Sequence, residues 1–271
     1  MISRILPPSA REAAREIEYF GGSPLQQVLP WVPKPRADSP GRPFVNDPEN
    51  QLVLFDFTST SPDSNPETFG KTFGALNDVV MGGQSEASVS LVKVPKQDGG
   101  CVAKLSGVVE GDNGGFASMR SRDFQPSVDL GDYYGLRLTV KGDGRRYKLI
   151  ARDVVDFFGL AWHCGFDTTE GEWLEIDVPF TELTPVLRAD VLRPDSSEWR
   201  TFRRDQLRSL QIMLSKYELG MKELNTTFAS GPFSLELKSI RAYKEERDPI
   251  VKKGREIVKS LKSGDSDNNA R

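Results

Sequence analysis

Short runs in which apolar and polar residues alternate dominate the middle of this 271-residue chain. Residues 135–140 and 173–178 both follow this pattern. A period of two is typical of a strand that buries one face. Glycine- and aspartate-rich turns, such as residues 112–115 and 142–144, separate the runs. Many short strands without a long helical period predict an all-β sandwich or barrel.

The sandwich is expected to span residues 52–244 as two mostly antiparallel layers. We expect strands at residues 52–57, 89–94, 101–109, 135–140, 147–151, 173–178, 209–214 and 233–243. The alternation places one apolar residue of most runs in the core. The inward positions should include Phe55, Leu105, Leu138, Leu149, Ile176, Ile212 and Leu237.

The flanks of the sandwich have a different composition. Ser9 and Glu12 form a capping box that predicts a helix over residues 9–20, within an N-terminal segment 1–22. Residues 23–51 are rich in proline, which predicts an extended linker. Residues 245–271 form a charged tail, with a short helix expected near 248–262.

Composition excludes several classes of protein. The net charge of −3 gives no reason to expect nucleic acid or an anionic membrane as a partner. Cys101 and Cys164 are the two cysteines and lie outside any CxxC motif, so we expect free thiols in a reducing compartment. We expect no membrane span, because no apolar run reaches about 18 residues. Residues 1–8 do not resemble a signal peptide, and the early glutamates argue against a transit peptide.

Few residues suggest catalysis or metal binding. His163 is the only histidine, so a site with several histidines is excluded. Its neighbour Cys164 should point to the opposite face of the same strand, which argues against a catalytic dyad. Residues 142–145 lack the Lys-Ser/Thr pair of a phosphate loop and are expected to form a tight turn. Asp112 and Asn113 offer a weak signal for a structural Ca²⁺.

Two sets of charged residues keep alternatives open. Asp56 and Glu236 are carboxylates in apolar surroundings, so a general acid/base pair is not ruled out by the sequence. A basic set would share one face if its strands are neighbours, either as a solvated face or as a docking patch for an acidic segment, with RNA as the minor option. Its members are Arg120, Arg122, Arg145, Arg146, Lys148 and Arg152.

Four stretches together resemble the complex I intermediate-associated protein 30 family. They are N-D-V-V-M-G-G-Q-S at 77–85, G-G-F-A-S-M-R-S at 114–121, Y-G-L-R-L-T-V-K-G-D-G-R at 134–145 and G-P-F-S-L-E-L-K-S-I at 231–240. The resemblance covers roughly residues 52–244. It implies a galactose-binding-like jelly roll, with short helical extensions expected at both ends of the chain, and a role in assembling respiratory complex I.

The stretch from Asp167 to Tyr243, including M-L-S-K-Y at 213–217, is more similar to the photosynthetic branch of this family. That branch includes high-chlorophyll-fluorescence factors for the assembly and translation of photosystem II, which also carry a dehydrogenase-like Rossmann domain. No GxGxxG motif follows a strand here, so the resemblance implies no nucleotide-dependent role.

We therefore expect a non-enzymatic assembly factor that binds protein subunits of a membrane electron-transfer complex, respiratory or photosynthetic, or its assembly intermediates. We expect no cofactor, and in particular no nicotinamide, flavin or ATP. The expected compartment is the chloroplast stroma with thylakoid association, or the cyanobacterial cytoplasm; the mitochondrial matrix is the alternative. Partner contacts are predicted on one shared surface by Asp78, Met81, Phe116, Arg120, Arg145 and Trp162.

Competing interpretations stay open. Residues 77–85 could simply form an Asx-type turn, in which Gly82 and Gly83 take positive φ, and Phe116 and Trp162 could be core residues. A carbohydrate-binding module on the same fold is the second function. Its candidate stacking rings are Trp162, Trp173, Trp199 and Tyr217. A hydrolase or oxidoreductase is the third, and the missing nucleotide, metal and nucleophile motifs argue against it.

Overall fold

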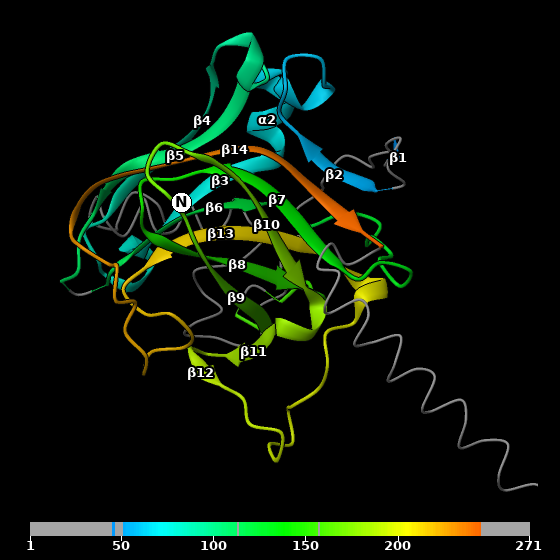
Figure 1. Cartoon of the computed structure of the whole chain (residues 1–271). Coiled ribbons are helices and arrows are strands. Elements are labelled where there is room, and N and C mark those ends of the chain that lie inside the picture. Colours follow the sequence, from blue (N-terminus) through cyan, green and yellow to red (C-terminus); the bar gives the residue numbers. More distant parts are fainter. Residues whose placement is uncertain (1–44, 47–50, 113, 157, 245–271) are drawn as a thin grey trace, which may run out of the picture.

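The computed structural model describes residues 45–46, 51–112, 114–156 and 158–244 (Figure 1). Two antiparallel sheets of seven strands each, sheet A and sheet B, form the two layers of the sandwich. This confirms the predicted all-β architecture. In the described ranges, no helix is long and apolar enough to cross a membrane.

Sheet A is built around the long strand β14 (Gly231–Tyr243), which pairs with three others. On one side β14 pairs with β5 and then with β2, and on the other side it pairs with β7. The remaining strands of the sheet are β1 (Val45–Asn46), β2 (Leu52–Asp56), β4 (Glu86–Lys93), β5 (Cys101–Val109), β7 (Gly135–Lys141) and β10 (Trp173–Pro179).

Sheet B has the strand order β12-β11-β9-β8-β13-β6-β3. Figure 1 shows β13, β8 and β9 side by side in this layer. The strands are β3 (Phe73–Asn77), β6 (Phe116–Ser121), β8 (Arg146–Arg152), β9 (Ala161–Asp167), β11 (Thr184–Leu187), β12 (Asp190–Val191) and β13 (Ser209–Ser215).

The core between the sheets follows the predicted alternation. Six of the seven predicted inward residues are buried and belong to one core cluster, and Ile176 packs against that cluster. Rings of Phe55, Phe57, Phe69 and Phe73 contact one another with centroids 4.6–6.0 Å apart, a spacing typical of favourable aromatic pairs. Phe69 belongs to α2 (Pro66–Thr72), so this cluster also anchors the α-helix.

Helix α2 and several strands were not predicted. Asn65 caps α2 by accepting from the amides of Glu67 and Thr68, and Pro66 occupies the first turn. The five 3-10 turns of the described residues are η3 (Pro62–Ser64), η4 (Asp78–Met81), η5 (Lys96–Asp98), η6 (Phe180–Glu182) and η7 (Arg204–Gln206). Among the unpredicted strands, β3 and β6 are rich in Gly, Ala and Ser, which weaken the strand signal.

The flanking predictions fall largely outside the described residues. This applies to the helix at 9–20, the helix near 248–262 and most of the linker 23–51. The exception is β1, where Val45 pairs with Val53 of β2, so this end of the predicted linker is a strand.

Candidate functional site

The four sequence stretches that carry the family resemblance meet at one end of the sandwich. Strands β3, β5, β7 and β13 end there, and the strands that follow them in the chain, β4, β6, β8 and β14, begin there. The amide of Gly115 donates to Asp78 at 2.7 Å, joining the first stretch to the second. The guanidinium of Arg145 donates to the carbonyl of Pro232 at 2.9 Å, joining the third to the fourth. We call this the loop end.

Asp78 fixes the first two stretches. Its carboxylate is fully buried and accepts hydrogen bonds from the amide of Ser85 (2.8 Å), the hydroxyl of Ser85 (2.6 Å) and the amide of Gly115 (2.7 Å). A side chain at Gly83 or Gly114 would overlap this carboxylate, which explains why glycine is needed at both positions. Asp78 therefore holds two loops together, and the prediction that it contacts a partner at the surface is wrong because it is inaccessible.

The expected tight turn at 142–145 is confirmed between β7 and β8, and its side chains bind β14. Asp143 accepts from the hydroxyl of Tyr147 (3.0 Å) and from the amide of Ser234 (3.1 Å). Burial, and then the charge of Asp143, raise the pKa of Tyr147. The contact of Arg145 with Pro232 completes this second link, so Arg145 is committed to the fold.

Phe116 and Met81 also lie at the loop end, whereas Trp162 does not. Phe116 is half-buried, and its amide donates to Asp78 at 3.3 Å. Met81 is the last residue of η4, and its side chain is outside the described structure. The expectation that Gly82 and Gly83 both take positive φ holds only for Gly82, at 85°.

Trp162 is a core residue. The indole is 1% exposed, its ring centroid lies 5.3 Å from that of Phe202, and the guanidinium of Arg200 stacks over it at 4.4 Å. The predicted surface position is therefore wrong, and the alternative that this ring is core is confirmed. Side chains of β9 alternate between the two faces of sheet B, and Trp162 and Phe166 lie on the face that packs in the core.

The outer face of sheet B collects the remaining predicted residue, Arg120, with other polar groups. Strand registers align Arg120, Gln211, Ile150 and His163 across β6, β13, β8 and β9. We use "the outer face" for the set Ser118, Arg120, Lys148, Ile150, Arg152, His163 and Gln211. Of the predicted basic set, Arg120, Arg146, Lys148 and Arg152 project on this side of sheet B, because they alternate with the inward residues of their strands.

Hydrogen bonds connect much of the outer face. Arg152 donates to the side-chain oxygen of Gln211 (3.0 Å), and Gln211 donates to the hydroxyl of Ser118 (2.8 Å). Arg120 is 1% exposed and lies 3.4 Å from the carboxylate of Asp123. Arg120 is therefore as inaccessible as Asp78, and the prediction that it contacts a partner at the surface is wrong.

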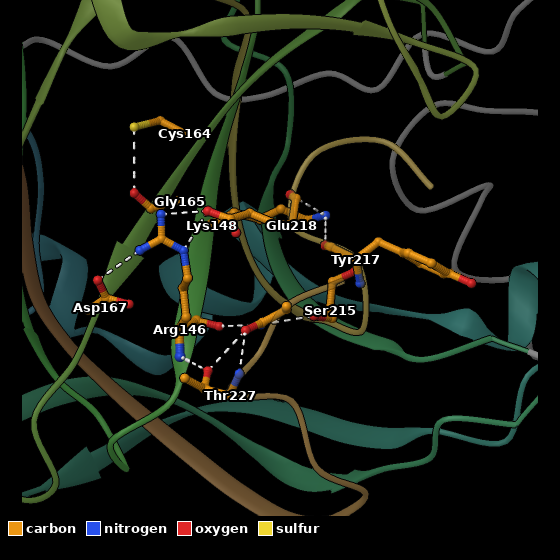
Figure 2. Close-up of polar contacts among 10 residues, drawn as sticks. Arg146, Lys148, Cys164, Gly165, Asp167, Ser215, Tyr217, Glu218 and Thr227 are labelled. Atoms are coloured by element: carbon orange, nitrogen blue, oxygen red, sulfur yellow. Dashed lines mark hydrogen bonds and ion pairs between the residues drawn. The ribbon is translucent and has the colours of Figure 1, made fainter. Parts of the chain in front are cut away.

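Lys148 is fixed at the loop end of the outer face. Its ammonium donates to the backbone carbonyls of Tyr217 (2.8 Å) and Glu218 (3.2 Å), as Figure 2 shows. The neighbouring Arg146 pairs with Glu218 (2.6 Å) and Asp167 (2.8 Å). Arg146, Lys148, Tyr217 and Glu218 are among the residues that line a hollow of about 10 Å³, which is room for roughly one water molecule.

Burial shapes the electrostatics of this face. It lowers the pKa of Lys148 to about 8. Burial, and then repulsion by Arg120, lower the pKa of Arg152 to about 9. The pKa of His163 is held well below its usual range by burial and then by the charges of Lys148 and Arg152. Burial therefore disfavours the charged forms of Lys148 and Arg152, while the carboxylate of Glu218 attracts Lys148 and those of Asp123 and Asp156 attract Arg152.

The other residues that the sequence offered for catalysis have structural surroundings or roles. His163 lies on the outer face while Cys164 packs against the core, as expected, and burial raises the pKa of the Cys164 thiol to about 11. Asp56 accepts from the amide of Thr58 in a turn, and Glu236 pairs with Lys141 at 2.7 Å. These two carboxylates therefore have structural roles.

Metal binding finds no support in the part of the chain that the structure describes. There, no group of three His, Cys, Asp or Glu side chains lies close enough to hold a metal ion. Asp112 is exposed, and Asn113 lies outside the described residues.

The four candidate stacking rings do not form a common platform. Trp162 is core, and Trp173 on sheet A lies under the ammonium groups of Lys238 (4.3 Å) and Lys141 (5.0 Å). Trp199 is 38% exposed in the loop that precedes η7, and Tyr217 is half-buried beside the hollow.

Two stacked antiparallel sheets with this strand order define a galactose-binding-like jelly roll. The fold is similar to that of the family 11 carbohydrate-binding module of the cellulosomal cellulase Lic26A-Cel5E of Clostridium thermocellum, with a TM-score of 0.50 and 16% identity over 74% of this chain and 99% of the module. An exo-beta-agarase matches with a TM-score of 0.42 and 13% identity over 73% of this chain and 26% of the agarase. At such identities the likeness concerns the fold alone.

The sequence identifies the family of this chain more specifically than the fold does. Residues 55–237 match the model of the family described as complex I intermediate-associated protein 30, and the chain belongs to this family. The resemblance carried by the four stretches is thereby confirmed. No curated protein sequence matches the chain.

Proposed function

We propose that this protein is a non-enzymatic assembly factor for a membrane electron-transfer complex, which acts by binding protein subunits or assembly intermediates. The observation that carries the proposal is the family match over residues 55–237, which spans most of the sandwich. The family description associates its members with an intermediate of complex I.

The side-chain chemistry supports binding over catalysis. The thiol of Cys164 is protonated near neutral pH because burial raises its pKa to about 11, so it is a poor nucleophile. The pKa of His163 is held well below its usual range by burial and then by the charges of Lys148 and Arg152. This imidazole is therefore poorly suited to accept a proton near neutral pH.

For the client, we propose a photosynthetic complex, with the chloroplast stroma or the cyanobacterial cytoplasm as the compartment. This finer assignment rests on the similarity of residues 213–217 and their surroundings to the photosynthetic branch. Respiratory complex I in the mitochondrial matrix is the alternative client and compartment.

Purification of the tagged full-length chain from native membranes tests the function. We expect subunits of one electron-transfer complex to co-purify, enriched in sub-complexes rather than in the mature complex. Recovery of the chain without any such subunit would contradict the proposal. A thermal-shift titration with NADPH, flavin and ATP is the companion test, since a bound ligand at about 100 times its Kd adds roughly 2.7 kcal/mol of stability; a saturable rise in Tm would contradict the non-enzymatic part.

Carbohydrate binding is less well supported by the geometry. Sugar-binding faces usually present aromatic rings, but Trp162 is buried and Trp173 is covered by two lysines. A mixed-linked β-glucan oligosaccharide is therefore expected to leave the Tm unchanged. A saturable increase would favour the carbohydrate-binding alternative.

A further inference from the structure

Two hairpin tips meet at the edge of sheet B and leave apolar side chains in solvent. The first tip, residues 188–191, comprises the turn after β11 and strand β12, and the second, residues 217–224, follows β13. We call the two tips together the hairpin patch. Its residues Val191, Met221 and Leu224 are 42%, 51% and 58% exposed, and they are three of the six large apolar residues that are exposed among the described residues. Exposed apolar residues that gather at one place mark an interaction site.

The two tips hold each other in place. A Cβ at Gly220 would lie 2.7 Å from the carbonyl oxygen of Ala189 and 3.3 Å from a methyl carbon of Val191, so this close approach requires glycine. The ammonium of Lys222 pairs with the carboxylate of Asp190 at 3.0 Å, and both side chains remain largely exposed. The apolar residues of the two tips therefore belong to one composite surface.

Contacts with sheet B fix the second tip. The ammonium of Lys148 binds the carbonyl oxygens of Tyr217 (2.8 Å) and Glu218 (3.2 Å), as Figure 2 shows. Arg146 pairs with the carboxylate of Glu218 at 2.6 Å, and the amide of Glu218 donates to the carbonyl of Glu223 at 2.9 Å. Because these contacts already order the backbone of the tip, a partner that binds it pays little ordering entropy.

The turn of the first tip is strained. Arg188 and Ala189 form the two-residue turn between β11 and β12, and both have positive φ, 51° and 69°. Such turns usually have asparagine and glycine at these positions, because a side chain makes this conformation unfavourable. Strain of this kind clusters at binding sites, where the surrounding structure maintains it. Here the packing of Gly220 against Ala189 gives that support.

The charges beside the apolar residues are balanced. The two tips carry two positive and two negative exposed side chains: Arg188, Lys222, Asp190 and Glu223. A balanced set has no net attraction for an anionic lipid surface or for a strongly charged protein. It is instead complementary to itself, because a two-fold axis can bring each charged side chain to an opposite charge of the second copy while the apolar residues meet.

We propose that the hairpin patch binds the same patch of a second copy of this chain and forms a two-fold symmetric dimer. Met221 and Leu224 of each copy pack at the centre, and Lys222 of one copy faces Asp190 of the other. The four residues 188–191 and the eight residues 217–224 are fewer than the roughly 20–30 that a standard interface uses on each side, so the dimer is weak and reversible.

Sedimentation velocity of the full-length chain tests the proposal. Between about 1 and 500 μM, the range in which a weak interface forms, we expect the mass to rise from that of one chain towards that of two. Met221→Gln with Leu224→Asn keeps the size of both side chains and should weaken the association at least about tenfold. The matched control is Val108→Thr with Val155→Thr, since these residues are 40% and 43% exposed outside the patch and should leave the association unchanged.

Exchange of charges tests the two-fold arrangement. Lys222→Glu makes the patch acidic and Asp190→Lys makes it basic, so each variant alone should associate more weakly than the wild type. An equimolar mixture of the two variants should associate at least as strongly as the wild type, because opposite charges then face each other. Both side chains are largely exposed, so the Tm of each variant should stay close to that of the wild type. These variants keep the test valid if Met221→Gln with Leu224→Asn does not fold.

Several outcomes would overturn the proposal. A wild-type mass of one chain at every concentration excludes the dimer. Equal weakening by the patch and control variants, or no gain on mixing the charge variants, shows that the patch does not meet itself. If the wild type stays at one chain but binds phosphatidylcholine vesicles, and Met221→Gln with Leu224→Asn abolishes this binding, the occupant is a membrane.

The dimer and the proposed function fail separately. If the wild type stays at one chain and the Met221→Gln, Leu224→Asn variant loses client subunits in the native-membrane purification, the patch is a client site and the dimer is wrong. If no subunit co-purifies with the wild type, the proposed function fails, whereas the dimer, which is measured on the purified chain, is unaffected.

Discussion

Replacement of Asp78 by alanine is expected to destabilise the domain by about 4 kcal/mol. The carboxylate has no exposure to solvent, and it accepts four hydrogen bonds, from Ser85 (two), Gly115 and Phe116. Hydrogen bonds to charged groups contribute about 1.5–3 kcal/mol each, but those in one network are not additive. Removal of one partner from a buried charged network costs about 3–5 kcal/mol, which sets the estimate.

Urea unfolding followed by tryptophan fluorescence measures this loss, with the free energy of unfolding taken by linear extrapolation. A domain of this size should also lose about 8–16 °C in Tm, at roughly 2–4 °C per kcal/mol. Asp78→Asn keeps the volume and one acceptor, so we expect an intermediate loss of about 2 kcal/mol. Asp112→Ala is the matched control, since Asp112 is exposed in the same loop as Gly115 and should change stability by less than about 0.5 kcal/mol.

A local measurement separates this mechanism from a general loss of packing. Amide hydrogen exchange should accelerate first at Ser85 and Gly115, whose N–H groups lose their acceptor in Asp78→Ala. If Asp78→Ala unfolds within about 1 kcal/mol of the wild type, or if these two amides stay protected, the carboxylate is not the link between the two loops.

Three further predictions follow from burial. Gly83→Ala should lower the free energy of unfolding in urea by at least about 2 kcal/mol, because its methyl group would overlap the carboxylate of Asp78. Gly70→Ala in α2, where a Cβ meets open space, is the control and should be neutral or slightly stabilising. Equal effects of the two substitutions would refute the overlap. Trp162→Ala should cost about 3–5 kcal/mol by leaving a cavity beside Phe202, and a loss below about 1 kcal/mol would show that the ring is not core. The pKa of His163 is lowered in the folded state, so on acidification the imidazole of the unfolded state is protonated before that of the folded state. The free energy of unfolding should therefore fall as the pH drops below about 6.5, by up to about 1.4 kcal/mol per pH unit. His163→Gln should remove this part of the acid slope, and an NMR titration midpoint of His163 near 6.5 would contradict the reasoning.

The sequence predicted the layers of this fold better than their connections. The alternation in residues 135–140 and 173–178 placed Leu138 and Ile176 on the inward side, and the structure confirms both. It also pairs these two residues directly across β7 and β10, which no local pattern could indicate. The helix α2 had a readable signal in Asn65 and Pro66, but the short helix is stabilised mainly by packing of Phe69 against other rings.

Candidate site residues were harder to assign. Aromatic and arginine residues near glycine turns were predicted at one surface, yet Trp162 is core and Arg145 holds β14. Composition does not distinguish an interface anchor from a core ring, because both demand a large apolar side chain. Lys148 and His163 had no role among the predicted contacts, although the basic set that included Lys148 did indicate a charged face.

By itself, the sequence determined the β architecture, the family and the inward face of most strands, because the pleat of a strand makes side-chain direction a local property with period two. Only the tertiary structure decided which residues meet. Asp78 and Gly115 are 37 residues apart in sequence, and Arg152 and Gln211 are 59 apart. Their contacts depend on strand order and register, which arise from the packing of the whole core. The same packing buries Lys148 and half-buries Arg152, and the loss of hydration lowers the pKa of both side chains.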